Sequence, residues 1–157
     1  MEVASLSELK KELKLLEKPE IAELCLRLAR YKKDNKELLH FLLFDQQNLD
    51  EYIQKVKLVI DESFRQIGGL NLYLANKSLR KVLRNTNKYI KYSGEKQIEV
   101  ELLIYFCQKL RVSGIKIYHS TQLSNLYQSQ LAKIERAMAK LHEDLQFDYQ
   151  QELERLR

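Results

Sequence analysis

The chain of 157 residues is 45% hydrophobic and 31% charged, with a net charge of +5. This much apolar content at so small a net charge excludes an intrinsically disordered chain, and a chain this long needs no disulfide or structural metal to fold. Four glycines and one proline are too few for an all-β fold, which needs turn residues about every 8–12 positions. We predict one all-α domain over residues 1–157, an irregular bundle of about seven helices built from antiparallel helical hairpins.

The first three predicted helices are separated by capping residues and by the single proline. Ser5 and Glu8 form a capping box, Pro19 suits a first helical turn, and Asp34 precedes a third helix. Residues 38–44 are apolar around most of this third helix, so we expect it to be buried between its neighbours. The three helices are predicted over 5–16, 19–33 and 34–44.

The next three helices are predicted over 48–67, 70–93 and 95–113. Asn48 with Glu51 marks the first start, and Gly68-Gly69 marks its end. Residues 100–107 are too apolar for a surface helix, which indicates that the third of these helices is central. Periodicity alone leaves open that residues 100–107 and 38–44 are buried strands, but each run continues into a longer helical pattern.

From Ser120 onward, apolar residues recur at steps of three and four up to Leu156. This stripe predicts one long C-terminal helix of about 50 Å, with residues 146–157 as a protruding or frayed end. The stripe can pack inside the molecule or mediate self-association. The preceding residues 114–119 are the least helical stretch and are expected to cross the bundle in extended form.

No catalytic, cofactor-binding or metal-binding residue is predicted, because no nucleotide-binding, hydrolase or metalloprotease motif is present. His142-Glu143-Asp144 is interpreted as a solvated helix face. Cys25 and Cys107 lie in apolar helical stretches, which indicates buried thiols in a reducing compartment. Without a signal peptide or an apolar run of about 20 residues, we expect a cytoplasmic protein without membrane contact.

The strongest functional signal is a concentration of positive charge on the helix predicted over 70–93. No acidic residue occurs between Glu62 and Glu95, and this interval carries seven basic residues, a local charge of +7. The rest of the chain therefore sums to −2, since +5 − 7 = −2. Spacings of three and four place the basic residues on one helix face, the candidate anion-binding face. Its members are Lys77, Arg80, Lys81, Arg84, Lys88 and Lys91.

Two interpretations of this face are open. In the first, the basic residues are simply solvated, or they pair inside the molecule with acids of the first helix (Glu8, Glu12, Glu17) or of the C-terminal segment. Alternatively, the face binds an anionic partner such as nucleic acid, with Asn85, Thr86, Asn87 and Tyr92 adding polar and aromatic contacts.

The opening of the chain carries a resemblance to a known group of proteins. Leu6-Ser7-Glu8-Leu9-Lys10-Lys11-Glu12-Leu13, Glu23-Leu24 and Asn35-Lys36-Glu37-Leu38-Leu39 resemble the start of small all-helical bacterial proteins of uncharacterised function. The resemblance is mainly to residues 5–45. It implies a bacterial cytoplasmic setting and an irregular helical bundle, and it transfers no functional residue.

We therefore predict a non-enzymatic helical module for protein–protein interaction, binding another protein or itself through the C-terminal helix. The alternative is a binder of an anionic partner, with nucleic acid possible, through the basic face at 77–91. An enzyme with a site assembled between helices is the third hypothesis.

Overall fold

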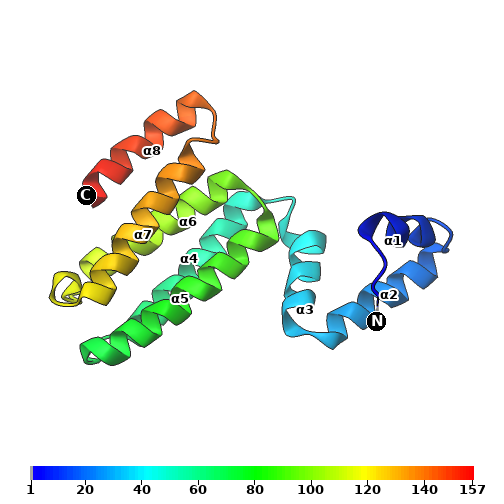
Figure 1. Ribbon diagram of the computed structural model, residues 1–157, viewed down its shortest axis with the longest axis horizontal. Coiled ribbons are helices and arrows are strands. Elements are labelled where there is room, and N and C mark those ends of the chain that lie inside the picture. Colours follow the sequence, from blue (N-terminus) through cyan, green and yellow to red (C-terminus); the bar gives the residue numbers. More distant parts are fainter. Residues whose placement is uncertain (1) are drawn as a thin grey trace. The chain divides into compact units, whose positions relative to one another are not determined.

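The computed structural model describes residues 2–157 and is all-α, as predicted (Figure 1). Within these residues there are eight α-helices and no strand. The described chain divides into two compact units, one up to Asp45 and one from Gln46 onward. This division differs from the single domain predicted over 1–157.

The N-terminal unit contains α1 (Leu6–Leu13), α2 (Lys18–Tyr31) and α3 (Lys33–His40), followed by the π-helical turn η1 (Phe41–Asp45). Ser5 caps α1 in the predicted capping box with Glu8, and Pro19 lies in the first turn of α2. No side chain of α1, α2 or α3 is fully buried. The expected burial of residues 38–44 is therefore wrong except at Phe41, since Leu43 and Phe44 are 60% and 68% exposed.

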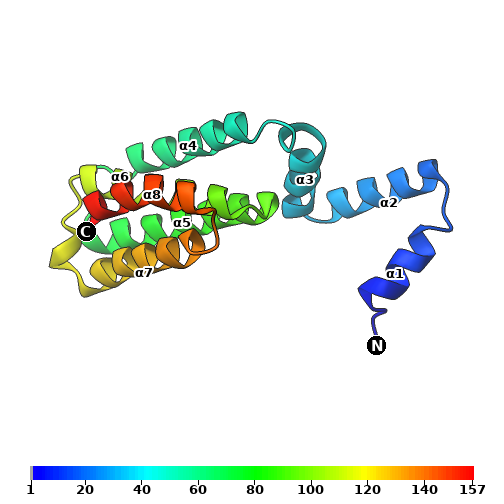
Figure 2. The same cartoon turned by 90° about the horizontal axis from the view of Figure 1, so that it is seen from above.

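The second unit is built around α6 (Lys96–Val112), which contacts each of the other four α-helices of the unit. These helices run alongside α6 in both views of the ribbon (Figures 1 and 2). The other four are α4 (Leu49–Arg65), α5 (Leu72–Ser93), α7 (Thr121–Met138) and α8 (Glu143–Leu156).

The central position of α6 confirms the sequence prediction, and the strand alternative for residues 100–107 is wrong. Leu102, Leu103 and Phe106 are completely buried. Because apolar residues surround α6, it can pack against helices on all sides, whereas a surface helix has one apolar stripe.

The predicted long C-terminal helix is wrong, because a turn at residues 139–142 separates α7 from α8. His142 caps α8, and its Nδ1 accepts a hydrogen bond from the Asp144 amide at 3.3 Å. Helix α8 packs on α6 and α7. Leu153 and Leu156 are buried there, so residues 146–157 belong to the packed unit and are not a protruding end.

The connection between α6 and α7 also differs from the extended crossing expected for residues 114–119. It contains the 3₁₀ turn η2 (Ile117–His119), with Ile117 buried. Gly114 precedes η2 with a φ of +76°, a conformation that glycine adopts without the steric cost of a side chain.

Candidate anion-binding face

The six predicted basic residues lie along the face of α5 opposite its apolar side. Leu79 and Val82 point into the core, at 0% and 6% exposure. The helix begins at Asn71, whose side chain accepts from the Leu74 amide, and ends at Gly94 in the left-handed conformation. Five of the six side chains are exposed, namely Lys77, Arg80, Lys81, Arg84 and Lys91.

These five side chains make no ion pair with another residue of the unit that begins at Gln46. The expected pairing with acids of the C-terminal segment is therefore wrong. Helix α8 lies on the other side of α6 and α7 from α5 (Figure 1). Of its acids, Glu154 pairs with Arg157 at 2.8 Å and Glu152 accepts from Gln108 at 3.2 Å.

Two of the six basic residues have contacts within α5. Arg80 Nε donates to Asn76 Oδ1 at 3.1 Å, which holds the guanidinium near the helix and leaves its other nitrogens toward solvent. Lys88 is half-buried, and its ammonium lies 5.5 Å from the centre of the Tyr89 ring. The face thus consists of five exposed cations and one, Lys88, that rests partly on an aromatic side chain.

Most of the polar and aromatic residues predicted to add contacts at this face instead contact other residues of the protein. Thr86 is buried and its hydroxyl donates to the Val82 carbonyl at 3.0 Å. Asn87 donates to the Leu83 carbonyl at 2.9 Å and accepts from Lys133 of α7. Tyr92 is half-buried against the edge of Tyr89, with ring centres 6.2 Å apart. Asn85 is also half-buried.

One aromatic residue of the face was missed by the sequence analysis. Tyr73 is 78% exposed and lies four residues before Lys77, so it extends the basic face by one turn. The same spacing of four that groups the basic residues predicts this position.

A second group of ionisable side chains converges between α4 and α6. Tyr105 donates to Asp61 Oδ1 at 2.7 Å, and Lys109 Nζ lies 2.8 Å from the same oxygen. Lys57 pairs with Glu101 at 2.7 Å, and the ammonium groups of Lys57 and Lys109 each lie 5.2 Å from the Tyr105 ring centre. Each of these two ammonium groups pairs with a carboxylate of the other helix, so the group joins α4 to α6.

The pKa shifts of Asp61, Tyr105 and Lys109 agree with a role of this group in joining α4 to α6. Burial favours a higher pKa for Asp61, but the hydrogen bonds from Lys109 and Tyr105 outweigh it and lower the pKa of this carboxyl. Burial and the bond to Asp61 raise the pKa of Tyr105, and the bond to Asp61 raises the pKa of Lys109. At neutral pH the group therefore combines an ionised Asp61, a neutral Tyr105 and a charged Lys109.

Other candidate chemistry is sparse among the described residues. They contain no group of three or more His, Cys, Asp or Glu side chains able to hold a metal ion. Cys107 is buried, which raises its pKa to about 12, whereas Cys25 is only half-buried, contrary to expectation. None of the described helices combines the length and apolar character needed to span a membrane.

In comparisons with known proteins, no protein family, no curated protein and no solved structure matches the chain.

Proposed function

We propose that this protein is a non-enzymatic binding module that holds an anionic polymer, a nucleic acid, along the basic face of α5. The observation that carries this proposal is the row of five exposed cations without an ion pair inside their unit. Exposed like charges on one helix face repel one another, and an anionic ligand removes this repulsion.

The length of the face suits a phosphate backbone. From Lys77 to Lys91 the helix rises about 21 Å, at 1.5 Å per residue. Phosphates along one strand of B-form DNA are about 3.4 Å apart, so this length faces roughly six of them. The six basic residues thus match the number of phosphates that the face spans. Such contacts to phosphates carry no sequence information, so we propose binding that depends weakly on base sequence.

The proposal is tested by removing three charges from the first half of the face. Replacing Lys77, Lys81 and Arg84 with Gln keeps good helix formers on α5 and lowers the net charge from +5 to +2. We expect binding of a mixed-sequence DNA of about 20 nucleotides to weaken at least tenfold. In a salt titration followed by fluorescence anisotropy, the slope of log K against log salt should fall by about 2, at 0.7 per phosphate contact.

The matched control is Lys10→Gln, Lys11→Gln and Lys14→Gln in the N-terminal unit, which also leaves a net charge of +2. If both triple variants lose affinity equally, net charge and not the α5 face is responsible. If the unaltered protein binds no DNA or RNA at low salt, the proposed function is wrong.

A protein partner is the second candidate function, favoured by the N-terminal unit. Its three helices bury no side chain, and Leu6, Leu9 and Leu13 form an exposed stripe along α1. A unit of about 45 residues is too small to stabilise itself by its own core. Residues 1–45 carry nine basic and nine acidic residues, 9 − 9 = 0, so two copies do not repel each other. We therefore take the partner to be a second copy of this unit.

Light scattering of the full chain tests this second candidate. We expect a dimer mass near twice 18.7 kDa and a monomer for the Leu9→Gln, Leu13→Gln variant, because both substitutions place polar groups in the apolar stripe. Lys11→Gln, on the opposite side of α1, is the control and should leave the dimer intact. A monomer for the unaltered chain at high concentration contradicts self-association. The C-terminal stripe is not the proposed contact, because Leu153 and Leu156 are already buried.

A further inference from the structure

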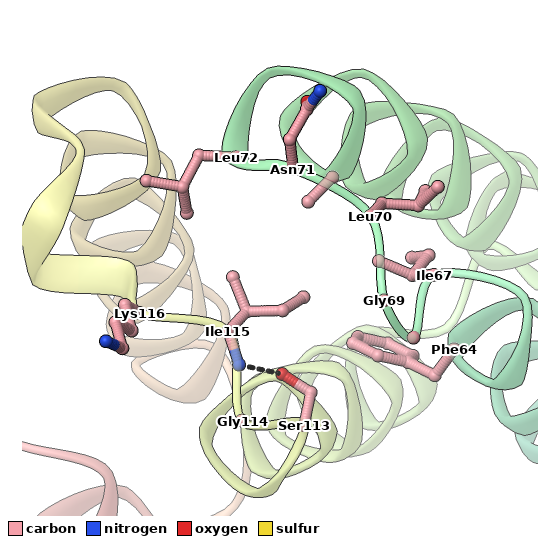
Figure 3. A pocket seen from close by; sticks show the side chains of 12 residues that line it. Phe64, Ile67, Gly69, Leu70, Asn71, Leu72, Ser113, Gly114, Ile115 and Lys116 are labelled. Carbon is pink, nitrogen blue, oxygen red and sulfur yellow. Dashed lines mark hydrogen bonds between the residues drawn. The ribbon is translucent and has the colours of Figure 1, made fainter.

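Two chain turns meet at the end of the second unit where α5 begins. Residues 67–72 and residues 113–116 line one hollow of about 300 Å³, shown in Figure 3 with Ile115 directed into it and Leu72 at its rim. A neighbouring hollow of about 360 Å³ shares Ile115 and Lys116 and is also lined by Arg111, Tyr118 and His119. The two hollows therefore adjoin each other, and the first is also lined by Asn71 and Leu72 at the start of α5.

The two turns that line the hollows contain no acidic residue. Both turns lie in long stretches without Asp or Glu, residues 63–94 and 102–134. The acids closest in sequence, Asp61 and Glu62 of α4, pair with Lys109 at 2.8 Å and with Arg65 at 2.7 Å. Lys77 and Lys116 are exposed at this end. An anionic chain following α5 therefore meets no acidic side chain of these two turns when it reaches the hollows.

The same end also presents two exposed aromatic rings. Tyr73 is 78% exposed at the start of the basic face, and Tyr118 is 70% exposed on the wall of the second hollow. Other tyrosines of the unit direct their hydroxyls to internal partners, as Tyr52 does to the Tyr89 carbonyl and Tyr127 to the Leu156 carbonyl. Neither Tyr73 nor Tyr118 contributes its ring to the core, so both rings are accessible to a ligand.

We infer that the nucleic acid bound along α5 is single-stranded, and that its unpaired bases stack on Tyr73 and Tyr118 at this end of the unit. The inference rests on the proposed function. Basic residues alone bind duplex and single strands alike through phosphates, but aromatic faces are used only by bases that are not enclosed in a double helix. The apolar hollow beside Leu72 and Ile115 can receive a displaced base, and the cations around it hold the backbone.

The test compares a single-stranded oligonucleotide of about 20 thymidines with a duplex of equal length at low salt, by fluorescence anisotropy. We expect the single strand to bind more tightly. Tyr73→Ala and Tyr118→Ala should each weaken single-strand binding at least about fivefold, because base stacking on one aromatic ring is worth about 1–3 kcal/mol. Duplex binding and the salt slope should change little, because neither variant removes a charge.

The matched controls are Tyr73→Phe and Tyr118→Phe, which keep the ring and should bind single strands within about twofold of the unaltered protein. Circular dichroism confirms that each variant is folded. Tighter binding of duplex, or Ala variants that bind single strands normally, overturns this inference. The proposed function remains intact in that case if the triple charge variant of α5 still binds nucleic acid at least tenfold more weakly than the unaltered protein. Tighter binding to phosphatidylserine vesicles than to the oligonucleotide also overturns it. No binding to any of the three ligands overturns the proposed function as well.

Discussion

Asp61 illustrates how one residue joins two helices of the second unit. Its carboxylate accepts from the Tyr105 hydroxyl and pairs with Lys109, and its side chain is 23% exposed. Partial burial strengthens a charged hydrogen bond relative to a fully exposed ion pair, since less solvent screens it. The lowered pKa of Asp61 and the raised pKa of Lys109 are the two expressions of this interaction.

We predict that Asp61→Asn lowers the free energy of unfolding by about 1.5–3 kcal/mol at pH 7, the usual range for losing a hydrogen bond to a charged group. The pKa of Asp61 is lower in the folded state than its ordinary value of 3.8. Its stabilising effect is therefore complete above pH 3.8 and is lost as the pH falls through the folded-state pKa. Denaturant titrations should show the difference between variant and unaltered protein shrinking below pH 3.8.

Glu62→Gln is the control for this prediction. Glu62 lies next in sequence, and it pairs with Arg65 on the surface, where both side chains are more than half exposed. Surface pairs contribute about 0–1 kcal/mol, so its loss should be smaller than that of Asp61. Equal effects of the two substitutions contradict a special contribution from the Asp61 group.

At the scale of elements, α8 shows how a tertiary contact overrides a continuous periodic pattern. The apolar stripe of residues 123–156 fits one uninterrupted helix, yet the chain turns at 139–142. A continuous helix exposes its last leucines to water, whereas the turn lets α8 bury Leu153 and Leu156 on α6 and α7. The Tyr127 hydroxyl, which donates to the Leu156 carbonyl at 2.7 Å, adds a bond that only the turned chain can make.

We predict that Leu153→Ala lowers the free energy of unfolding by about 2–5 kcal/mol, the usual cost of a cavity in a well-packed core. In an unpacked helix the same change is neutral or stabilising, because Ala has the higher helix propensity. Gln151→Ala on the exposed side of α8 is the control and should change stability by less than about 0.5 kcal/mol. Denaturant titration of both variants distinguishes a packed α8 from an unpacked one. If Leu153→Ala has the same free energy of unfolding as the unaltered protein, the packing of α8 is contradicted.

At the scale of the whole molecule, charge is distributed unevenly between the two units. Residues 1–45 are neutral, so the net charge of +5 belongs to residues 46–157. Within the second unit, α5 and the two acid-free stretches concentrate positive charge, while residues 143–157 carry five acids and two arginines, 2 − 5 = −3. A field of this kind directs an anionic ligand toward α5 before contact, and salt weakens the attraction.

The sequence by itself determined the features that depend on neighbouring residues. The helical class follows from the scarcity of glycine and proline. The N-caps at Ser5 and Asn48 were predicted correctly, because a capping side chain bonds only to the first turn of its own helix. The apolar residues around the whole circumference of α6 predicted its central position. The basic face was also predictable, because spacing of three and four fixes which residues share a helix side.

Only the tertiary structure decided which of these local features face water. In the folded chain, the C-terminal segment packs on α6, and Thr86 and Asn87 form hydrogen bonds inside the molecule and not at the basic face. Tyr73 is exposed beside that face. The tertiary structure also showed that α8 does not neutralise the cations of α5. These outcomes depend on contacts between residues far apart in the chain, and such contacts are set by which apolar surfaces can be buried together.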